Sequence, residues 1–383
     1  MRTNFSVFVL LLIFCTGIFA QSGRRIKPTP TPTPNISAEP NYSESIPRKK
    51  RERIIPSFRS PEGIMQKEIS QTKSSGSEAD TEDPDAVLKV ETTLITIPVS
   101  VFDRNGVYKT GLEKHNFTIF EDGKPQEIAY FGTSDKPFTV VLLIDTSPST
   151  EYSINEIRSA ATAFVDQLKP EDQVMVIEFD ANVHVLTETT SDREKIYKAI
   201  RRADFGGGTS LYEAVNFSLA KRLNEIEGRK AIVLFTDGVD TTSRKATYDN
   251  TLDLAEESDS LIFPVYYNTF FDVNRDNIGL GIPIGGTAPG TSSAEYAVGK
   301  QYLEDLASYT GGRVFRPEAT PGGLKRAFEG IAEELRRQYN IGYIPEEDGI
   351  PGQRKIIKVR VNQSGLIVRS RDSYIVGETK KGQ

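Results

Sequence analysis

The chain has 383 residues, of which 37% are hydrophobic and 26% are charged, and its formal net charge is −6. This length predicts two domains plus additional segments, and the low hydrophobic content predicts that part of the chain stays unfolded. The mild negative charge gives no reason to expect nucleic-acid binding.

The first twenty residues have the features of a secretory signal peptide. Arg2 is followed by a hydrophobic run from Ser6 to Ala20, which is shorter than the roughly 20 residues that a membrane span needs. An uncleaved anchor is the alternative, and Phe14 before Cys15 argues against a lipoprotein signal. We expect cleavage after Ala20 and export to the periplasm or the extracellular space. The mature chain then has no cysteine, which excludes disulfides and thiol chemistry, and no membrane span.

Residues 21–85 are predicted to form a disordered linker. The run KPTPTPTPN favours polyproline II, and the rest is mostly Ser, Glu, Lys and Pro with few aromatic residues. The basic run RKKRER at 48–53 is read as part of this solvated linker, with attraction to an anionic envelope surface as the alternative.

Two separate parts of the chain have the alternating pattern of β-strands. Residues 86–135 contain VLKVETTLITIPVSVFD and then HNFTIFEDGKPQEIAYF, which breaks at Asp122-Gly123. Residues 340–377 supply further strands in RKIIKVRVN and GLIVRSRDSYIVG, next to YNIGYIPE at the boundary. Since three strands make a thin core, we predict that both parts pair into one small β-sandwich-like domain.

Residues 137–339 alternate differently, with continuous apolar strands separated by helical patterns. FTVVLLID, QVMVIEFD, KAIVLFTD and LIFPVYYN are the main strands, VHVLTETT follows as an antiparallel edge strand, and RVFR is a short strand. Strands buried on both faces and separated by helices predict an α/β fold, with a doubly wound and mostly parallel sheet of Rossmann-like type. This domain is inserted into the β-domain.

Oxygen-bearing side chains follow the strands of this predicted sheet. Asp145, Ser147 and Ser149 follow the first strand, Asp237 follows another, and Thr209 stands in FGGGTSLYEAV just before a helix. An ordinary turn would explain the first group alone. However, open parallel sheets bind ligands at the carboxyl ends of their strands, so the three segments are predicted to meet at one solvent-facing rim.

Hard oxygen ligands without His or Cys favour Mg²⁺, with Mn²⁺ or Ca²⁺ as alternatives, and do not favour zinc. If hydroxyl groups contact the metal and the carboxylates act mainly through water, the cation keeps much of its charge. It would then attract a carboxylate from outside.

These motifs resemble the metal-ion-dependent adhesion site of von Willebrand factor A domains. The match consists of D-x-S-x-S at 145–149, GGGTSLYEAV and FTDG, and the resemblance covers about 138–339. The flanking segments are similar to a bacterial group of secreted von Willebrand factor A-related proteins. The resemblance implies that Ser147, Ser149 and Thr209 contact the cation while the aspartates support it. It also implies that an acidic side chain of a protein partner completes the metal shell.

The leading interpretation is an exported, non-enzymatic protein-binding module. A metal-dependent hydrolase or phosphotransferase, or a structural envelope protein with a stabilising metal, stays open. His115 and His184 are interpreted as structural or surface groups. Asp240 is interpreted as an exposed loop carboxylate, with orientation of the site from beside the metal ligands as the alternative. Tyr266 and Tyr267 are interpreted as packing residues, with a place at the rim as the alternative. GLGIPIGG at Gly279 lacks the spacing of a dinucleotide-binding motif. It lies in the Gly- and Pro-rich segment 271–293, whose length is typical of functional or disordered loops.

Overall fold

The computed structural model describes residues 41–46, 94–133, 136–148, 154–267, 292–318, 320, 322–347 and 349–376. All of them belong to one compact unit, Pro40–Gln383. No helix within these residues is long and apolar enough to cross a membrane. The predicted signal peptide 1–20 and residues 271–291 of the Gly- and Pro-rich segment lie outside the described residues.

The middle of the chain forms the predicted mostly parallel sheet. Its strand order is β10-β9-β6-β7-β8, and only β8 runs antiparallel to its neighbour. The central strand β6 is buried along all eight of its residues, which explains its uninterrupted apolar sequence. The strands are β6 Phe138–Asp145, β7 Gln173–Phe179, β8 Val183–Thr190, β9 Arg229–Thr236 and β10 Leu261–Tyr266.

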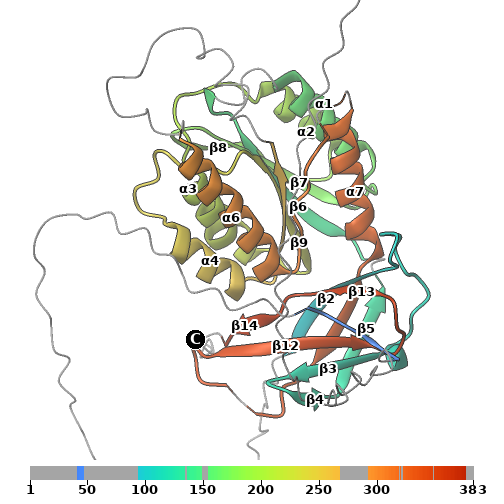
Figure 1. Ribbon diagram of the computed structural model, residues 1–383. Helices are drawn as coiled ribbons and strands as arrows, with labels where there is room; N and C mark the ends of the chain where they lie inside the picture. Colours follow the sequence, from blue (N-terminus) through green and yellow to red (C-terminus); the bar gives the residue numbers. More distant parts are fainter. Residues whose placement is uncertain are drawn as a thin grey trace, which may run out of the picture. The chain divides into compact units, whose positions relative to one another are not determined.

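Helices cover both faces of this sheet, as Figure 1 shows. One core joins the sheet to α1, α2 and α7, and a second core joins its other face to α3, α4 and α6. The helices are α1 Ile154–Asp166, α2 Arg193–Arg202, α3 Leu211–Phe217, α4 Tyr248–Glu257, α6 Ser293–Thr310 and α7 Gly323–Arg337. Helix α3 continues through a π-helical turn, Ser218–Arg222, and a 3₁₀ turn, Leu223–Glu225. The α/β prediction is therefore confirmed.

The sequence pattern RVFR forms less structure than predicted. Phe315 makes a single parallel bridge to Val265 of β10, through two backbone hydrogen bonds of 2.7 and 2.8 Å. In the described residues the pairing stays an isolated bridge, so no full strand forms at this edge of the sheet.

The β-domain consists of two sheets that enclose a third core. The first has the order β1-β12-β3-β4, with β14 also paired to β12, and the second has the order β13-β2-β11-β5. Both sheets combine strands from the two ends of the chain, which confirms the predicted insertion. The strands are β2 Ile95–Phe102, β3 Phe117–Glu121, β4 Lys124–Gln126, β5 Ile128–Thr133, β11 Tyr339–Tyr343, β12 Arg354–Val361, β13 Ile367–Arg369 and β14 Ser373–Ile375.

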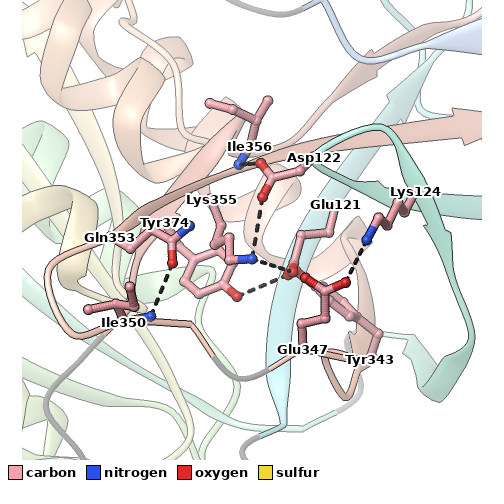
Figure 2. Close-up of polar contacts among 10 residues, drawn as sticks. All are labelled: Glu121, Asp122, Lys124, Tyr343, Glu347, Ile350, Gln353, Lys355, Ile356 and Tyr374. Carbon is pink, nitrogen blue, oxygen red and sulfur yellow. Dashed lines mark hydrogen bonds and ion pairs between the residues drawn. The ribbon is translucent and has the colours of Figure 1, made fainter.

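A buried carboxylate connects the two ends of the chain inside this domain. Glu121 accepts hydrogen bonds from the hydroxyls of Tyr343, at 2.5 Å, and Tyr374, at 2.9 Å (Figure 2). The ammonium group of Lys355 lies 3.5 Å from Glu121 and 3.4 Å from the neighbouring Asp122. Four strands thus share one polar cluster, so the ion pair and the hydrogen bonds compensate the burial of Glu121.

The linker prediction is wrong for one short piece. Within the predicted disordered range 21–85, Ser43–Glu44 form strand β1, which pairs antiparallel with β12. Glu44 also bonds the guanidinium of Arg360, and the Ser45 hydroxyl accepts from the amide of Val359. Two residues are too few to show an alternating pattern in the sequence. Ser43 and Glu44 are extended because they pair with the edge of β12.

Buried ionic contacts join the α/β domain to the β-domain. Glu256 of α4 is fully buried and accepts from Arg354 of β12 and from the Ser373 hydroxyl of β14. Glu334 of α7, also fully buried, accepts from Arg313 at 2.7 Å and lies 3.4 Å from Arg369 of β13. Two helices of the α/β domain are thereby fixed to strands of the β-domain.

Candidate metal site

The two predicted aspartates lie at the point where the sheet reverses its strand order. The chain passes from β6 to β7 on one side of β6, and β9 pairs with the other side. Such a switch point leaves a crevice at the carboxyl ends of the strands. Asp145 ends β6, and Asp237 directly follows β9.

Backbone and hydroxyl groups hold both aspartates. Asp145 accepts from the amide of Ser147 at 3.0 Å and from the hydroxyl of Thr236 at 2.6 Å. The Thr236 oxygen in turn accepts from the amide of Gly238 at 3.0 Å, and Asp237 accepts from the amide of Val239 at 3.1 Å. Thr236 thus connects the ends of β6 and β9, a role that the sequence analysis did not identify.

All four described candidates are buried, which corrects one expectation. The exposed fractions are 0% for Asp145, 1% for Ser147, 2% for Asp237 and 6% for Thr209, so Asp145 does not lie on a solvent-facing rim as predicted. Ser149, the fifth candidate, lies outside the described residues.

Two buried carboxylates close together produce an unfavourable electrostatic environment. Burial, followed by the negative charge of Asp237, raises the pKa of Asp145 to about 7. The hydrogen bonds from Ser147 and Thr236 act in the opposite direction but do not cancel this effect. A cation between the two carboxylates would remove the repulsion.

The glycine-rich segment before Thr209 is held against the ends of β6 and β7. Gly206 donates to the carbonyl of Thr146 at 3.1 Å, and the carbonyl of Gly207 accepts from Ala181 at 3.0 Å. A Cβ at Gly206 would lie 1.6 Å from a carboxylate oxygen of Asp180, so this close approach requires glycine. The segment therefore places Thr209 at the same edge of the sheet as Asp145.

Thr209 is also connected to the chain that follows Asp237. Its carbonyl accepts from the amides of Thr241, at 2.8 Å, and Thr242, at 3.0 Å, and its amide donates to the Thr241 hydroxyl at 2.9 Å. The three predicted segments thus meet through backbone contacts. The turn interpretation of Asp145, Ser147 and Ser149 explains only the Asp145–Ser147 contact and not this convergence.

These residues fit a hard divalent cation. The set combines two carboxylates with hydroxyl groups, and the mutual repulsion of the carboxylates disfavours leaving both ionised without a cation. No group of three or more His, Cys, Asp or Glu side chains that could hold a metal occurs among the described residues. A cation at this place would therefore need the serine and threonine oxygens in addition to the two aspartates.

Other candidate residues of the sequence have structural contacts, near this edge of the sheet or, for His115, in the β-domain. Asp240, expected to be an exposed loop carboxylate, is half-buried and accepts from the amide of Tyr212 in α3. Tyr267 packs on Phe235, and burial and the charge of Asp237 raise the pKa of Tyr266. His184 lies 3.5 Å from Asp180, and His115 lies 3.4 Å from Glu113 in the β-domain.

Part of the chain is similar in sequence to a known protein. An uncharacterized protein of Synechocystis, sll0103, is 31% identical over 106 residues, which cover 27% of this chain. The match spans only a quarter (25%) of that relative's length.

Two solved structures have similar folds. A von Willebrand factor type A protein from Catenulispora acidiphila is 12% identical, with a TM-score of 0.41 and 76% of each chain covered. Proximal thread matrix protein 1 of the mussel byssus, in a structure whose MIDAS motif holds zinc, is 14% identical, with a TM-score of 0.39. The likeness covers 56% of this chain and 49% of the mussel protein.

The family model of the von Willebrand factor type A domain matches residues 140–239. This range includes Asp145, Ser147, Ser149, Thr209 and Asp237, together with the strands β6, β7 and β9 that carry the crevice. The chain therefore contains a von Willebrand factor type A (VWA) domain.

Proposed function

We propose that the VWA domain binds a divalent cation, Mg²⁺ in the first instance, and uses it to capture an acidic side chain of a protein partner. The observation that carries this proposal is the burial of Asp145 and Asp237 at the β6–β9 switch point, beside Ser147 and Thr209.

The hydroxyls of Ser147, Ser149 and Thr209 would hold the cation, and the two aspartates would supply negative charge next to it. When bound, the metal offers a coordination position to an oxygen atom from outside the chain. Neutral hydroxyl ligands leave more positive charge on the metal than carboxylate ligands do. A carboxylate from the partner is therefore the preferred external ligand.

We further propose that the protein acts outside the cytoplasm. The support for this is the signal-like sequence of residues 1–20, followed by the Pro-Thr run. Mass spectrometry of cell fractions tests it, and an intact N-terminus found only in the cytosol would refute export.

The test of the binding function is capture of partners from an envelope extract on the immobilised mature chain. In Mg²⁺ the wild type should retain specific proteins that EDTA releases, and Asp145→Ala should retain none of them. Asp192→Ala, at the opposite end of the sheet, is the control and should capture the same proteins as wild type. Equal capture in EDTA, or by Asp145→Ala, would contradict metal-dependent binding.

A further inference from the structure

The segment that carries Thr209 and the loop that carries Asp237 are braced against each other by two carboxylates. Neither carboxylate belongs to the five residues of the metal motif. They are Asp240, three residues after Asp237, and Glu213, four residues after Thr209. Each one reaches from its own segment to backbone amides of the other.

Asp240 holds the start of helix α3. One of its carboxylate oxygens accepts from the amide of Tyr212 at 3.1 Å and from the hydroxyl of Ser243 at 2.6 Å. The other oxygen accepts from the amide of Ser243 at 3.2 Å. Amides in the first turn of a helix have no partner within the helix, so the Asp240 carboxylate supplies one. Thr209 lies two residues before this helix.

Glu213 makes the reciprocal contacts. One of its carboxylate oxygens accepts from the amides of Arg244, at 3.2 Å, Lys245, at 2.8 Å, and Ala246, at 3.4 Å. The amide of Glu213 itself donates to the hydroxyl of Ser243 at 3.1 Å. The loop after Asp237 is therefore held on both sides of Ser243.

We propose that Asp240 and Glu213 are positioning residues of the metal site. This inference rests on the proposed metal-dependent function and identifies what fixes the geometry of that site. Thr209 and Asp237 belong to segments that are 28 residues apart, and ligands must be held within about 0.5 Å of their productive positions. The crossed carboxylate contacts fix the distance between these two segments without touching the metal.

The first test is a Mg²⁺ titration of the full mature chain by calorimetry. Asp240→Ala should weaken Mg²⁺ binding by about 10-fold to 100-fold, the range typical of residues that orient metal ligands. Asp240→Asn should lie between this variant and wild type, because its amide oxygen can still accept from Tyr212. The Asn variant also keeps the test valid if the Ala variant does not fold.

Asp192→Ala is a matched control. Asp192 caps helix α2 by accepting from the amide of Lys195 at 3.2 Å, so its loss removes the same kind of contact. Because β8 runs antiparallel to β7, Asp192 lies at the opposite end of the sheet from the site. Its removal should lower the unfolding midpoint comparably and leave Mg²⁺ affinity unchanged.

Double variants separate positioning from a general structural role. If Asp240 acts through Thr209, adding Asp240→Ala to Thr209→Ala should cost little further affinity. Added to Ser147→Ala, Asp240→Ala should lower Mg²⁺ affinity by the same factor as it does in the wild type. The proposal would be overturned if the double variant Thr209→Ala/Asp240→Ala lost Mg²⁺ affinity by the product of the two single losses. Wild-type Mg²⁺ affinity in Asp240→Ala would overturn it as well. Failure of the wild type to bind Mg²⁺ would instead refute the underlying metal function, and the positioning role would fall with it.

Discussion

Gly238, next to Asp237, and Gly299 of helix α6 lie backbone against backbone. A Cβ at Gly299 would lie 2.4 Å from the carbonyl oxygen of Gly238, and a Cβ at Gly238 would lie 2.8 Å from the carbonyl carbon of Gly299. The loop that holds Asp237 is thus supported by a helix that contributes no side chain at the contact.

Gly299→Ala should therefore disturb the metal site from outside it. An alanine in an exposed helix normally stabilises by up to about 1 kcal/mol over glycine, whereas overpacking here should destabilise by about 1 to 3 kcal/mol. We expect a lower urea midpoint and weaker Mg²⁺ binding, measured by chemical unfolding and calorimetry. A more stable protein with unchanged affinity would show that the loop moves aside without consequence.

The pKa of Asp145 predicts a pH-dependent stability of the metal-free protein. A carboxyl whose folded-state pKa, about 7, exceeds its unfolded value of about 3.9 contributes stability that is fully present below pH 4 and lost as the pH rises through 7. Asp145→Asn imitates the protonated form. In EDTA it should be more stable than wild type at pH 8, by up to a few kcal/mol. The advantage should shrink toward pH 5.

Urea unfolding of both proteins between pH 5 and pH 8 measures this difference. In wild type, Mg²⁺ affinity should also rise with pH up to about 7, because protons compete with the metal for Asp145. An Asn variant that is less stable than wild type at pH 8 would contradict the repulsion between the two carboxylates.

Removal of Glu121 should destabilise the β-domain strongly. Glu121→Ala leaves the buried Lys355 without one of its two carboxylate neighbours and removes the charged acceptor of two tyrosine hydroxyls, and we expect a loss of about 3 to 5 kcal/mol. Tyr374→Phe removes a single bond to the carboxylate and should cost about 1.5 to 3 kcal/mol. Urea unfolding checks both values, and equal stabilities of the two variants would contradict the larger contribution of the Glu121 carboxylate.

Removal of the chain after Tyr339 should expose the apolar faces of β2, β3 and β5. These strands take their partners β11, β12 and β13 from the C-terminal part of the chain. We expect the truncated protein to aggregate, as measured by light scattering and size-exclusion chromatography. A soluble truncated protein that unfolds cooperatively would show that the N-terminal strands form a core without them.

Much of this architecture follows from hydrophobic periodicity alone. The buried run of β6 and the amphipathic helices α1, α2 and α7 are visible because each depends on its own side chains. The insertion of one domain into another was predictable as well, since residues 86–135 lack enough strands for a core. Strand β1 was not, because Ser43 and Glu44 pair only where β12 offers an open edge.

The candidate site was predictable in its residue types but not in its environment. Spacing placed Asp145 and Asp237 at strand ends, yet it gave no information on how deeply they are buried. The link through Thr236 and the contacts of Asp240 depend on which loops meet across the sheet. Such contacts between distant segments have no signature in a single sequence.

The central claim is that oxygens from three segments form one cation site. Calorimetric titration of Mg²⁺ into wild type, Asp145→Ala, Thr209→Ala and Asp237→Ala tests it most directly, with circular dichroism as the control for folding. We predict binding to wild type, no measurable binding to either aspartate variant and clearly weaker binding to Thr209→Ala. Folded variants that all bind Mg²⁺ with wild-type affinity would contradict the convergence of these residues on a metal.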